Sequence, residues 1–537
     1  MAEPQSTSYD QLPYVSQAFA QTHPDRLAVL AKLFGMSPPS LENCRVLELG
    51  CAGGGNLIPM AATMPSATFV GIDLSARQIA GGQAAAAALG LRNVDLRQQS
   101  IADVDESTGM FDYIVAHGVY SWVPRDVQEA ILAVCKRNLA PNGVAYVSYN
   151  TYPGWRMRGM IRDMMLYHAQ QFGDAPLRVQ QARALLDFLV QSVPTENNPY
   201  GILLKQEVEG LRNAGDWYVF HEHLEEVNEP LYFHQFAERA AAGGLQYLGE
   251  AEFDSMLASN FPPQVEETLR KIAPDIIRME QYMDFVRNRL FRQTLLVHQE
   301  LSLNRNLDWR TMQGFHVASP ARPTNASPDL RPNAIEHFRT PRGAGVATAV
   351  PIVKAAMTVL SELWPQGMAF GDLCSAARRR VESGSLLAQD GSAAAADAQV
   401  LGADLLRCFA SSLVELRIRP ARFARQAGSR PRASVVSRLQ ADKSSRVTNL
   451  RHEDVNLDEF NRQLLRHLDG SRDRSALLAV MEELVNKGEL SINRQGRAVT
   501  DPTAIRQILG EALDDNLPKL ASAALLEEDA DGPRTPG

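Results

Sequence analysis

A glycine-rich turn follows a buried-looking strand in the segment Cys44–Asn56, CRVLELGCAGGGN. Glycine has no Cβ, so the backbone of such a turn can pass close to a bound ligand. A helix that opens at about Asn56 would direct free N–H groups toward the same place. The stretch therefore predicts a cradle for a nucleoside-type cofactor above the turn.

Two acidic residues narrow the class of ligand. Glu48 stands two residues before Gly50, and Asp73 ends the next predicted strand, where a carboxylate suits the two hydroxyls of a ribose. No Lys or Arg adjoins the glycines to bind a pyrophosphate, and Glu48 would repel one. These residues favour S-adenosylmethionine, which has a nucleoside, a cationic sulfonium and an amino-acid end, over a dinucleotide.

The cofactor contacts are expected at the carboxyl ends of the strands, where ligands bind in open α/β sheets. Ser100 and Ile101, after the third predicted strand, are placed to meet an adenine. The full set predicted to line the cofactor is Glu48, Gly50, Cys51, Ala52, Gly54, Asn56, Asp73, Leu74, Ser100, Ile101 and His117.

Alternating strands and helices must position these side chains. Strands are predicted at 44–49, 67–72, 93–98, 111–116 and 143–149, with helices at 55–64, 75–89 and 125–139 between them. This alternation indicates an α/β fold with a parallel, doubly wound sheet. A helical stretch follows the fifth strand. Two further strands, at 245–250 and 291–297, are separated by a long helix at about 264–290, and they complete a seven-stranded Rossmann-like sheet.

The chain as a whole is too long for one ordinary core, since it has 537 residues. The C-terminal part is expected to form mainly helical, winged-helix-like modules. The predicted divisions are an N-terminal arm at 1–43, the cofactor-binding core at 44–150, a helical regulatory insertion at 151–229, the end of the sheet at 230–300, a linker at 301–349, a first C-terminal module with a basic linker at 350–450, a second module at 451–512 and an acidic tail at 513–537.

The segment Glu48–Gly54, ELGCAGG, resembles the E-x-G-x-G-x-G motif of class I S-adenosylmethionine-dependent methyltransferases, with Ala52 in place of the middle glycine. Other stretches resemble a bacterial subgroup with a methyltransferase regulatory domain, similar to the rickettsial protein lysine methyltransferases. These stretches are QTHPDRL at 21–27, HGVYSWVP at 117–124, NTYPGW at 150–155, QYMDF at 281–285 and HLDGSRDR at 467–474. The resemblance implies an S-adenosylmethionine domain with further middle and C-terminal domains, a protein substrate and a homodimer.

Methyl transfer is an in-line displacement, so the enzyme has to position the nucleophile and deliver it uncharged. A substrate lysine must lose a proton, for which a desolvated pocket with polar acceptors is the expected device. The catalytic candidates, which follow the fourth and fifth strands, are Tyr120, Asn150 and Tyr152. Aromatic walls, including Trp122, suit a methylammonium or sulfonium. For three of these residues a structural role is an alternative to a role in the site. Trp122 would then belong to the core, His117 would cap the end of the strand, and Tyr152 would pack in the turn before Pro153.

His221-Glu222-His223 would place two imidazoles on one face if the segment were an extended strand. A third ligand is not apparent, so no metal site is predicted. Five cysteines form no C-x-x-C pair, which indicates reduced thiols. With no secretory signal and no apolar run of about 18 residues, the expectation is a cytoplasmic protein without a membrane span.

The distribution of charge along the chain indicates whether nucleic acid is an expected partner. The formal net charge is −8, with −11 in residues 1–300 and +3 in residues 301–537, which argues against a general nucleic-acid binder. The basic run at 417–451 leaves open a cofactor-sensing regulator with DNA-binding winged-helix modules, although aromatics that would stack on bases are nearly absent there. Methylation of a small molecule or lipid is a further alternative, and the large accessory region argues against it.

Overall fold

The computed structural model describes residues 12, 14–382, 391–494 and 497–528, and it divides into two compact units. The first unit contains the residues up to Gln17, Ser37–Ala61 and Pro65–Leu303. The second contains Ala18–Met36, Ala62–Met64 and the chain from Asn304 onward. No described helix combines the length and the apolarity that crossing a bilayer requires.

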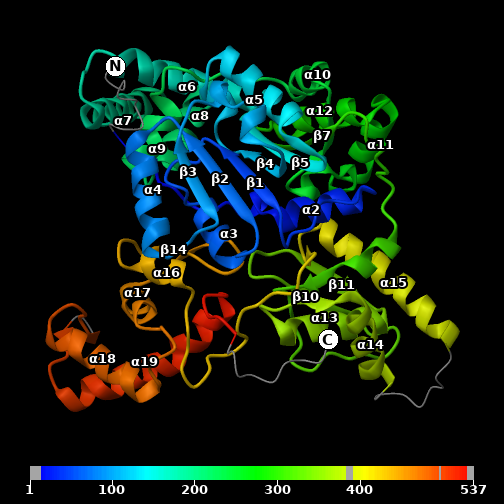
Figure 1. Cartoon of the computed structure of the whole chain (residues 1–537), viewed down its shortest axis with the longest axis vertical. Helices are drawn as coiled ribbons and strands as arrows, with labels where there is room; N and C mark the ends of the chain where they lie inside the picture. Colours follow the sequence, from blue (N-terminus) through cyan, green and yellow to red (C-terminus); the bar gives the residue numbers. More distant parts are fainter. Residues whose placement is uncertain (1–11, 13, 383–390, 495–496, 529–537) are drawn as a thin grey trace. The chain divides into compact units, whose positions relative to one another are not determined.

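A seven-stranded sheet flanked by helices forms the first unit (Figure 1). The strand order is β3-β2-β1-β4-β5-β7-β6, with β1 to β5 parallel and β7 antiparallel to both β5 and β6. The predicted seven-stranded Rossmann-like sheet is therefore confirmed. Its strands are β1 Arg45–Leu49, β2 Thr68–Asp73, β3 Val94–Gln98, β4 Phe111–Ala116, β5 Leu139–Asn150, β6 Leu245–Glu250 and β7 Phe291–His298.

The central strands are buried along most of their length because helices cover both faces of the sheet. Helix α5, for example, buries Ile131, Leu132 and Val134 against the core that the sheet provides. The helices that alternate with the strands are α3 Leu57–Thr63, α4 Ala76–Ala88, α5 Arg125–Arg137 and α10 Phe233–Ala242. Short 3-10 turns lie at Ile101–Asp103, Glu106–Thr108, Tyr120–Trp122, Phe253–Met256 and Ala258–Asn260.

The insertion between β5 and α10 is helical, with a hydrophobic core of its own that includes Ile161, Val179, Leu204 and Phe220. Its helices are α6 Gly154–Ala169, α7 Ala175–Ser192, α8 Pro199–Leu211 and α9 Asp216–His223. Because His221 and His223 lie on α9, the extended strand assumed for them is wrong. Residues two apart on a helix are separated by about 200° around its axis, so the two rings do not share a face.

The single long helix predicted at 264–290 is wrong, since two helices occupy this stretch. They are α11 Pro263–Ile272 and α12 Ile276–Arg287. The break falls at Pro274-Asp275: proline cannot continue α11, and the Asp275 side chain accepts a hydrogen bond from the Arg278 N–H as the cap of α12.

The second unit begins with helix α2 Pro24–Leu33, of which eight residues are buried. Asp25 on this helix accepts a hydrogen bond from the Ile418 N–H at 2.6 Å, so α2 is fixed to a strand late in the chain. The stretch 1–43, predicted as one arm, is thus divided between the two units, with residues 18–36 in the second. A helix that is buried on nearly all sides needs partners on several sides.

The predicted linker at 301–349 contains short strands, which are too short to show a periodicity in sequence. The small sheets have the orders β11-β10-β9 and β12-β8-β13. The elements of this part are the 3-10 turns Ala20–Thr22 and Trp309–Gly314, strands β8 His316–Ala318, β9 Arg322–Pro323, β10 Glu336–Arg339, β11 Gly345–Thr348, β12 Met368–Ala369 and β13 Glu415–Arg417, and helices α13 Pro351–Leu363, α14 Phe370–Glu382 and α15 Gly391–Ala410.

The C-terminal part combines helices with two short hairpins, as predicted for a winged-helix-like module. Its elements are α16 Val435–Ala441, β14 Arg446–Thr448, β15 Asp454–Asn456, α17 Glu459–Arg466, α18 Arg474–Asn486, β16 Asn493–Arg494, β17 Arg497–Ala498 and α19 Pro502–Ser522. Helix α19 continues past the tail boundary predicted at 513, because Leu513, Leu517 and Leu520 pack into the module's core. The last part of that predicted tail, 529–537, lies outside the described residues.

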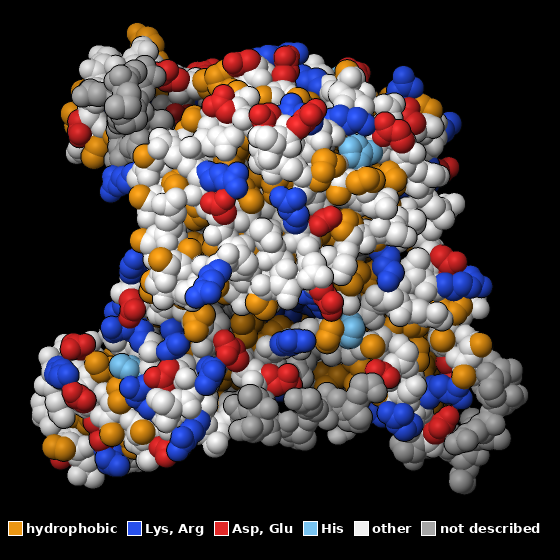
Figure 2. Space-filling view, viewed as in Figure 1, with side chains coloured by type: hydrophobic (Ala, Val, Ile, Leu, Met, Phe, Trp, Pro, Cys, Tyr) orange, Lys and Arg blue, Asp and Glu red, His pale blue; other side chains and the backbone are white. Residues whose placement is uncertain are grey.

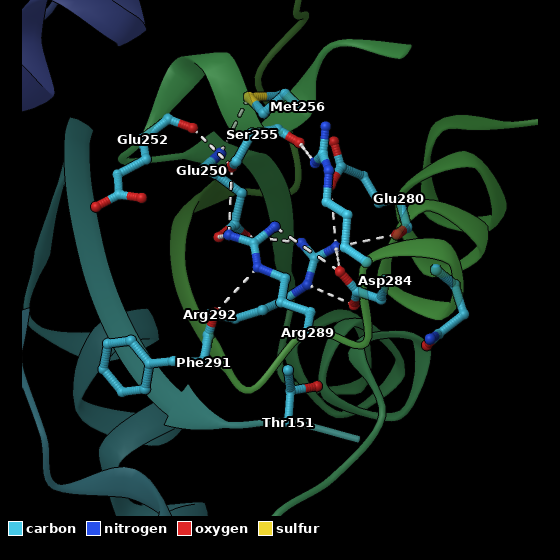
Figure 3. Close-up of polar contacts among 12 residues, drawn as sticks. Thr151, Glu250, Glu252, Ser255, Met256, Glu280, Asp284, Arg289, Phe291 and Arg292 are labelled. Carbon is cyan, nitrogen blue, oxygen red and sulfur yellow. Dashed lines mark hydrogen bonds and ion pairs between the residues drawn. The ribbon is translucent and has the colours of Figure 1, made fainter. Parts of the chain in front are cut away.

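A buried cluster of charges holds β6, β7 and α12 together (Figure 3). Arg292 on β7 is 0% exposed, and its guanidinium contacts Glu250 at 2.8 Å, Glu280 at 3.0 Å and Asp284 at 2.8 Å. Arg289 adds an ion pair with Glu250 at 3.0 Å. Burial raises the pKa of Glu280 to about 7, which brings three carboxyls close to charge balance with two guanidiniums.

Replacing Arg292 by Met should therefore destabilise the protein strongly, because the variant leaves three buried carboxyls with Arg289 as their remaining cation. The expected loss in the free energy of unfolding is about 3–5 kcal/mol, measured by urea denaturation. Arg278→Met is the matched control: this α12 side chain is 64% exposed, and its loss should change stability by less than about 0.5 kcal/mol. Equal effects for the two variants would contradict a stabilising role for the cluster.

Candidate active site

The predicted site residues lie along one edge of the sheet, where the carboxyl ends of β1 to β5 meet. The turn after β1 requires glycine, since Gly50 and Gly54 have φ values of 75° and 71°. A Cβ on Gly50 would also lie 2.5 Å from Cγ2 of Val119. The loop after β4 thus packs directly on the turn after β1.

Ala52, the residue that departs from the glycine motif, still adopts the left-handed conformation with φ 48°. This conformation costs an alanine about 1 kcal/mol. The Ala52 N–H donates to Oδ2 of Asp73 at 2.9 Å, and the Ser75 N–H donates to Oδ1 at 2.9 Å. Asp73 therefore ties the turn after β1 to the end of β2.

Glu48 is buried beneath the turn and is only half satisfied. Its Oε1 accepts a hydrogen bond from Nδ2 of Asn56 at 2.8 Å, whereas its Oε2 finds no donor among the described residues. Burial raises the pKa of Glu48 to about 8, and the charge of Asp73 adds to the shift. A buried carboxyl oxygen without a donor is costly, so a ligand that offers a cationic N–H group fits here.

Apolar side chains stand farther along the same edge. Leu74, directly after Asp73, is 60% exposed, and Ile101 follows the neighbouring strand β3. The Ser100 hydroxyl is occupied as an acceptor for the Ala102 N–H at 3.2 Å. Burial raises the pKa of the Cys51 thiol, whose sulfur lies 2.7 Å from where a Cβ on Gly71 would be. Leu74 thus offers apolar surface for a flat ring, Ile101 is buried in the core next to this edge, and Cys51 packs as a neutral thiol.

His117 follows β4, the strand between β1 and β5. Its Nδ1 lies 2.8 Å from the hydroxyl of Tyr146 and 3.4 Å from that of Ser148. Burial lowers the pKa of His117 to about 3, so the imidazole is neutral near pH 7. Its neighbour Phe291 approaches with the ring centroids 6.1 Å apart. His117 is thus a polar but uncharged group beside an aromatic wall.

Of the three catalytic candidates, the structure brings Asn150 and Tyr152 to the site's edge. The Asn150 N–H donates to the Ser121 hydroxyl at 2.9 Å, and its Nδ2 donates to Oδ1 of Asn228 at 3.1 Å. Tyr152 is half-buried, with the Arg156 guanidinium 3.9 Å from its ring centroid. Asn150 is the last residue of β5, and Tyr152 follows it by two residues, at the same edge of the sheet as the end of β4.

The third candidate, Tyr120, lies in the hydrophobic core. It is 0% exposed, and its ring packs against Phe236 at 5.2 Å and Tyr149 at 6.0 Å. Its hydroxyl lies 3.5 Å from the Arg239 guanidinium. This environment does not support contact with a substrate. Trp122, by contrast, is half-buried and meets the ring of Trp155.

The two histidines of α9 have separate environments. His221 contacts the Leu12 carbonyl oxygen at 2.6 Å and Glu225 at 2.8 Å. His223 is fully buried, and neither ring nitrogen has a hydrogen-bond partner among the described residues. Within the described part of the chain, no three His, Cys, Asp or Glu side chains are grouped to hold a metal ion.

Residues before the sheet also line the glycine turn, and sequence reasoning did not identify them. The Gly55 N–H donates to the Ser16 hydroxyl at 2.7 Å, and Nε2 of Gln78 donates to the Tyr14 carbonyl at 3.2 Å. A Cβ on Gly55 would lie 2.4 Å from the Ser16 carbonyl carbon. The sequence did contain one signal for this contact, namely the glycine at position 55, one residue beyond the motif. A glycine is required there because the Ser16 backbone approaches too closely for a Cβ.

Family models match three parts of this chain. They describe a methyltransferase domain at residues 46–143, a predicted methyltransferase regulatory domain at 215–298 and a PKMT C-terminal winged helix domain at 429–525. The regulatory-domain match overlaps only the last part of the insertion predicted to be regulatory at 151–229. It covers instead the segment that contains β6, α11, α12 and β7.

Whole-length similarity links the chain to rickettsial proteins. RP789, an uncharacterised protein of Rickettsia prowazekii, is 38% identical over 527 residues, which cover 96% of this chain and 93% of that protein. RP028 of the same organism is 45% identical over 43% of this chain and 93% of its own length. The structure of PKMT2 from Rickettsia typhi matches with a TM-score of 0.84 and 32% identity over 96% of this chain and 100% of that one. A second structure of PKMT2 contains AdoHcy.

The buried carboxyl of Glu48 should make the protein's stability depend on pH. In the unfolded chain this group ionises near pH 4.5 and in the folded protein near pH 8, so the folded state holds its proton more tightly. Its contribution to stability is therefore complete below about pH 4.5 and is lost as the pH rises through 8. Glu48→Gln removes this loss and should be more stable than the native protein above pH 8, by on the order of 3–5 kcal/mol.

Urea unfolding of the ligand-free native protein and of Glu48→Gln, at pH 5 and at pH 8.5, measures the difference in their free energies of unfolding. Glu42→Gln, on an exposed residue six positions earlier, is the control and should show no change of that size. A Glu48→Gln effect that is the same at both pH values would contradict the raised pKa.

Proposed function

This chain belongs to the class I S-adenosylmethionine-dependent methyltransferases with a methyltransferase regulatory domain, and we propose that it methylates lysine side chains of a protein substrate. The observation that carries the choice of substrate is the whole-length likeness to PKMT2, since it includes the accessory regions as well as the cofactor-binding core. A homodimer and a cytoplasmic location stay predictions.

The residues at the sheet edge fit S-adenosylmethionine. Glu48 would accept the ammonium of its amino-acid end with the unpartnered Oε2, and the Asp73 carboxylate at the end of β2 would accept the ribose hydroxyls. Leu74 would flank the adenine, next to the buried Ile101. When bound, the cofactor supplies an electrophilic methyl group on a sulfonium.

The surface beside the ends of β4 and β5 supports a polypeptide as the methyl acceptor. An aromatic series runs from Tyr152 to Tyr232, with centroids 5.3 Å apart, and from Tyr232 to Phe285 at 6.0 Å. Phe285 is 47% exposed, and further exposed apolar residues near it are Val286, Leu290 and Met157. Exposed apolar surface of this kind marks interaction sites, and aromatic and methionine side chains are typical of them.

The alternative of a DNA-binding regulator finds less support. Residues 429–525 contain fifteen Lys and Arg against fourteen Asp and Glu, so the winged-helix module is nearly neutral. Arginines of this module pair with its own carboxylates, for example Arg474 with Asp514 and Arg506 with Glu482. Figure 2 shows Lys and Arg interspersed with Asp and Glu over α18 and α19. A nucleic-acid surface would require unpaired cations in excess.

The proposed function can be tested with native cell extract from an organism that encodes this protein. The purified enzyme is incubated with the extract and methyl-labelled S-adenosylmethionine, and mass spectrometry then locates the label. We expect label on lysine side chains of one or a few proteins. Label confined to small molecules or lipids would contradict a protein substrate.

Asp73→Ala should abolish measurable cofactor binding while the protein remains folded. Two hydrogen bonds that fix the glycine turn and the proposed ribose contacts are lost together, each worth about 1.5–3 kcal/mol because the carboxylate is charged. Titration calorimetry with S-adenosylhomocysteine should show at least a roughly thirtyfold weaker affinity. Asp95→Ala, on the exposed side of β3, is the control. Unchanged affinity in Asp73→Ala would defeat the cofactor site.

Tyr152→Phe should lower turnover about tenfold or more with little change in cofactor affinity, if its hydroxyl contributes one hydrogen bond to the acceptor amine. Tyr120→Phe is the matched control, since its hydroxyl lies in the core; it should keep turnover within about twofold. Turnover is measured on the labelled protein identified in the extract. The reverse ranking of the two variants would show that Tyr120, and not Tyr152, serves the reaction.

A further inference from the structure

A short segment ahead of the sheet connects the helical insertion with the glycine turn. We call this segment, residues 12 and 14–17, the strap. Its described residues lie in no helix or strand, so contacts with other elements of the first unit fix its position. The four residue steps from 12 to 16 span at most about 14 Å, which makes the strap a short connection.

One end of the strap is fixed to the helical insertion. Leu12 packs against the insertion's hydrophobic core, and its carbonyl oxygen lies 2.6 Å from Nε2 of His221. A carbonyl oxygen can only accept, so His221 donates this hydrogen bond. The rings of Tyr14 and Trp217 meet edge to face, with their centroids 4.9 Å apart. Both partners lie on α9, the first helix of the segment that the regulatory-domain model matches.

The other end of the strap holds the glycine turn. The Ser16 hydroxyl accepts the Gly55 N–H at 2.7 Å, and the Tyr14 carbonyl accepts a hydrogen bond from Gln78 on α4 at 3.2 Å. The turn follows β1 and α4 follows β2. The strap therefore contacts both connections that border the cofactor site, while its first residues stay attached to α9.

The position of the turn at Gly55 affects the carboxyl group that is expected to bind the cofactor. The next residue, Asn56, donates from its Nδ2 to Oε1 of Glu48 at 2.8 Å. A displacement of the backbone at Gly55 would carry Asn56 with it and change the geometry around Glu48. The strap thus acts on the cofactor site through the turn, without having to contact the ligand.

We propose that the strap couples α9 to the cofactor site, so that its docking on α9 tightens the binding of S-adenosylmethionine. The coupling is reciprocal, because cofactor that binds better with the strap docked must also hold the strap in place. The strap itself is the element with two states, docked and released. The inference rests on the cofactor site at the glycine turn and does not depend on the class of methyl acceptor.

Gly55→Ala tests the strap from the side of the turn. The three atoms nearest to a Cβ on Gly55 all belong to Ser16 and Gln17, at 2.4 to 2.6 Å, so the new methyl group displaces the strap. We expect the affinity for S-adenosylhomocysteine, measured by titration calorimetry, to fall about fivefold or more. Gly81→Ala on α4 is the matched control, since its Cβ meets open space, and it should keep the affinity within about twofold.

Trp217→Ala tests the same coupling from α9, because it removes the ring on which Tyr14 docks and leaves the turn unchanged. It should also weaken S-adenosylhomocysteine about fivefold. Added to Gly55→Ala, which has already displaced the strap, it should cost less than about twofold more. If Gly55→Ala binds too weakly to measure, Tyr14→Ala takes its place in this cycle. Tyr167→Ala, which removes a 74% exposed ring of the same insertion, is the control.

Limited proteolysis with chymotrypsin measures the reciprocal effect. Cleavage after Tyr14, identified by mass spectrometry, requires the strap to be released. Saturating S-adenosylhomocysteine should slow this cleavage severalfold in the native protein. Trp217→Ala and Gly55→Ala should each speed it in the absence of ligand.

The failures of the coupling and of the cofactor site are distinguishable. The coupling is overturned if Trp217→Ala changes neither the affinity nor the cleavage, or if the effects of the two variants simply multiply. Cleavage after Tyr14 that bound S-adenosylhomocysteine does not slow overturns it as well. In each of these cases the native protein still binds S-adenosylhomocysteine, whereas absence of binding to the native protein contradicts the cofactor site itself.

Discussion

The guanidinium of Arg292, taken entirely out of water, is the constraint from which the rest of the sheet follows. Its three carboxyl partners come from β6 and α12, so the ion pairs fix the register of β7 against β6. The next residue, Gln293, points to the opposite face of the strand, toward Tyr146. A slip of one residue would bury the amide among the charges and leave the arginine facing His117. The ion cluster thereby determines the chemistry of a site to which it does not belong.

Much of this architecture could be predicted from local sequence. The apolar runs of β1, β4 and β5, the glycines of the turn and the acid that ends β2 each indicate their role within a few residues. The break at Pro274-Asp275 was equally readable, because proline followed by a capping aspartate ends one helix and begins another. It was missed only because apolar residues continue on both sides of it.

The site itself was less predictable, because its decisive contacts join distant segments. Nothing near Tyr120 in sequence shows that its ring packs on Phe236, and nothing near Gly55 names Ser16 as its neighbour. Likewise, Glu48 reads as a motif residue, yet its half-satisfied carboxyl becomes visible only with Asn56 in place. Residue type indicates what a side chain can do, whereas long-range packing decides which way it faces.

Helix α2 has a consequence for how the chain is made. Its hydrogen-bond partner Ile418 is 393 positions downstream, so α2 is synthesised long before that partner exists. At translation rates of about 5–20 residues per second, the apolar surface of α2 waits about 20–80 s for its partners. During that interval the nascent chain exposes the apolar residues that α2 buries in the folded unit. Holding chaperones therefore have a natural target there, and the second unit cannot be completed until its segments from Asn304 onward have been made.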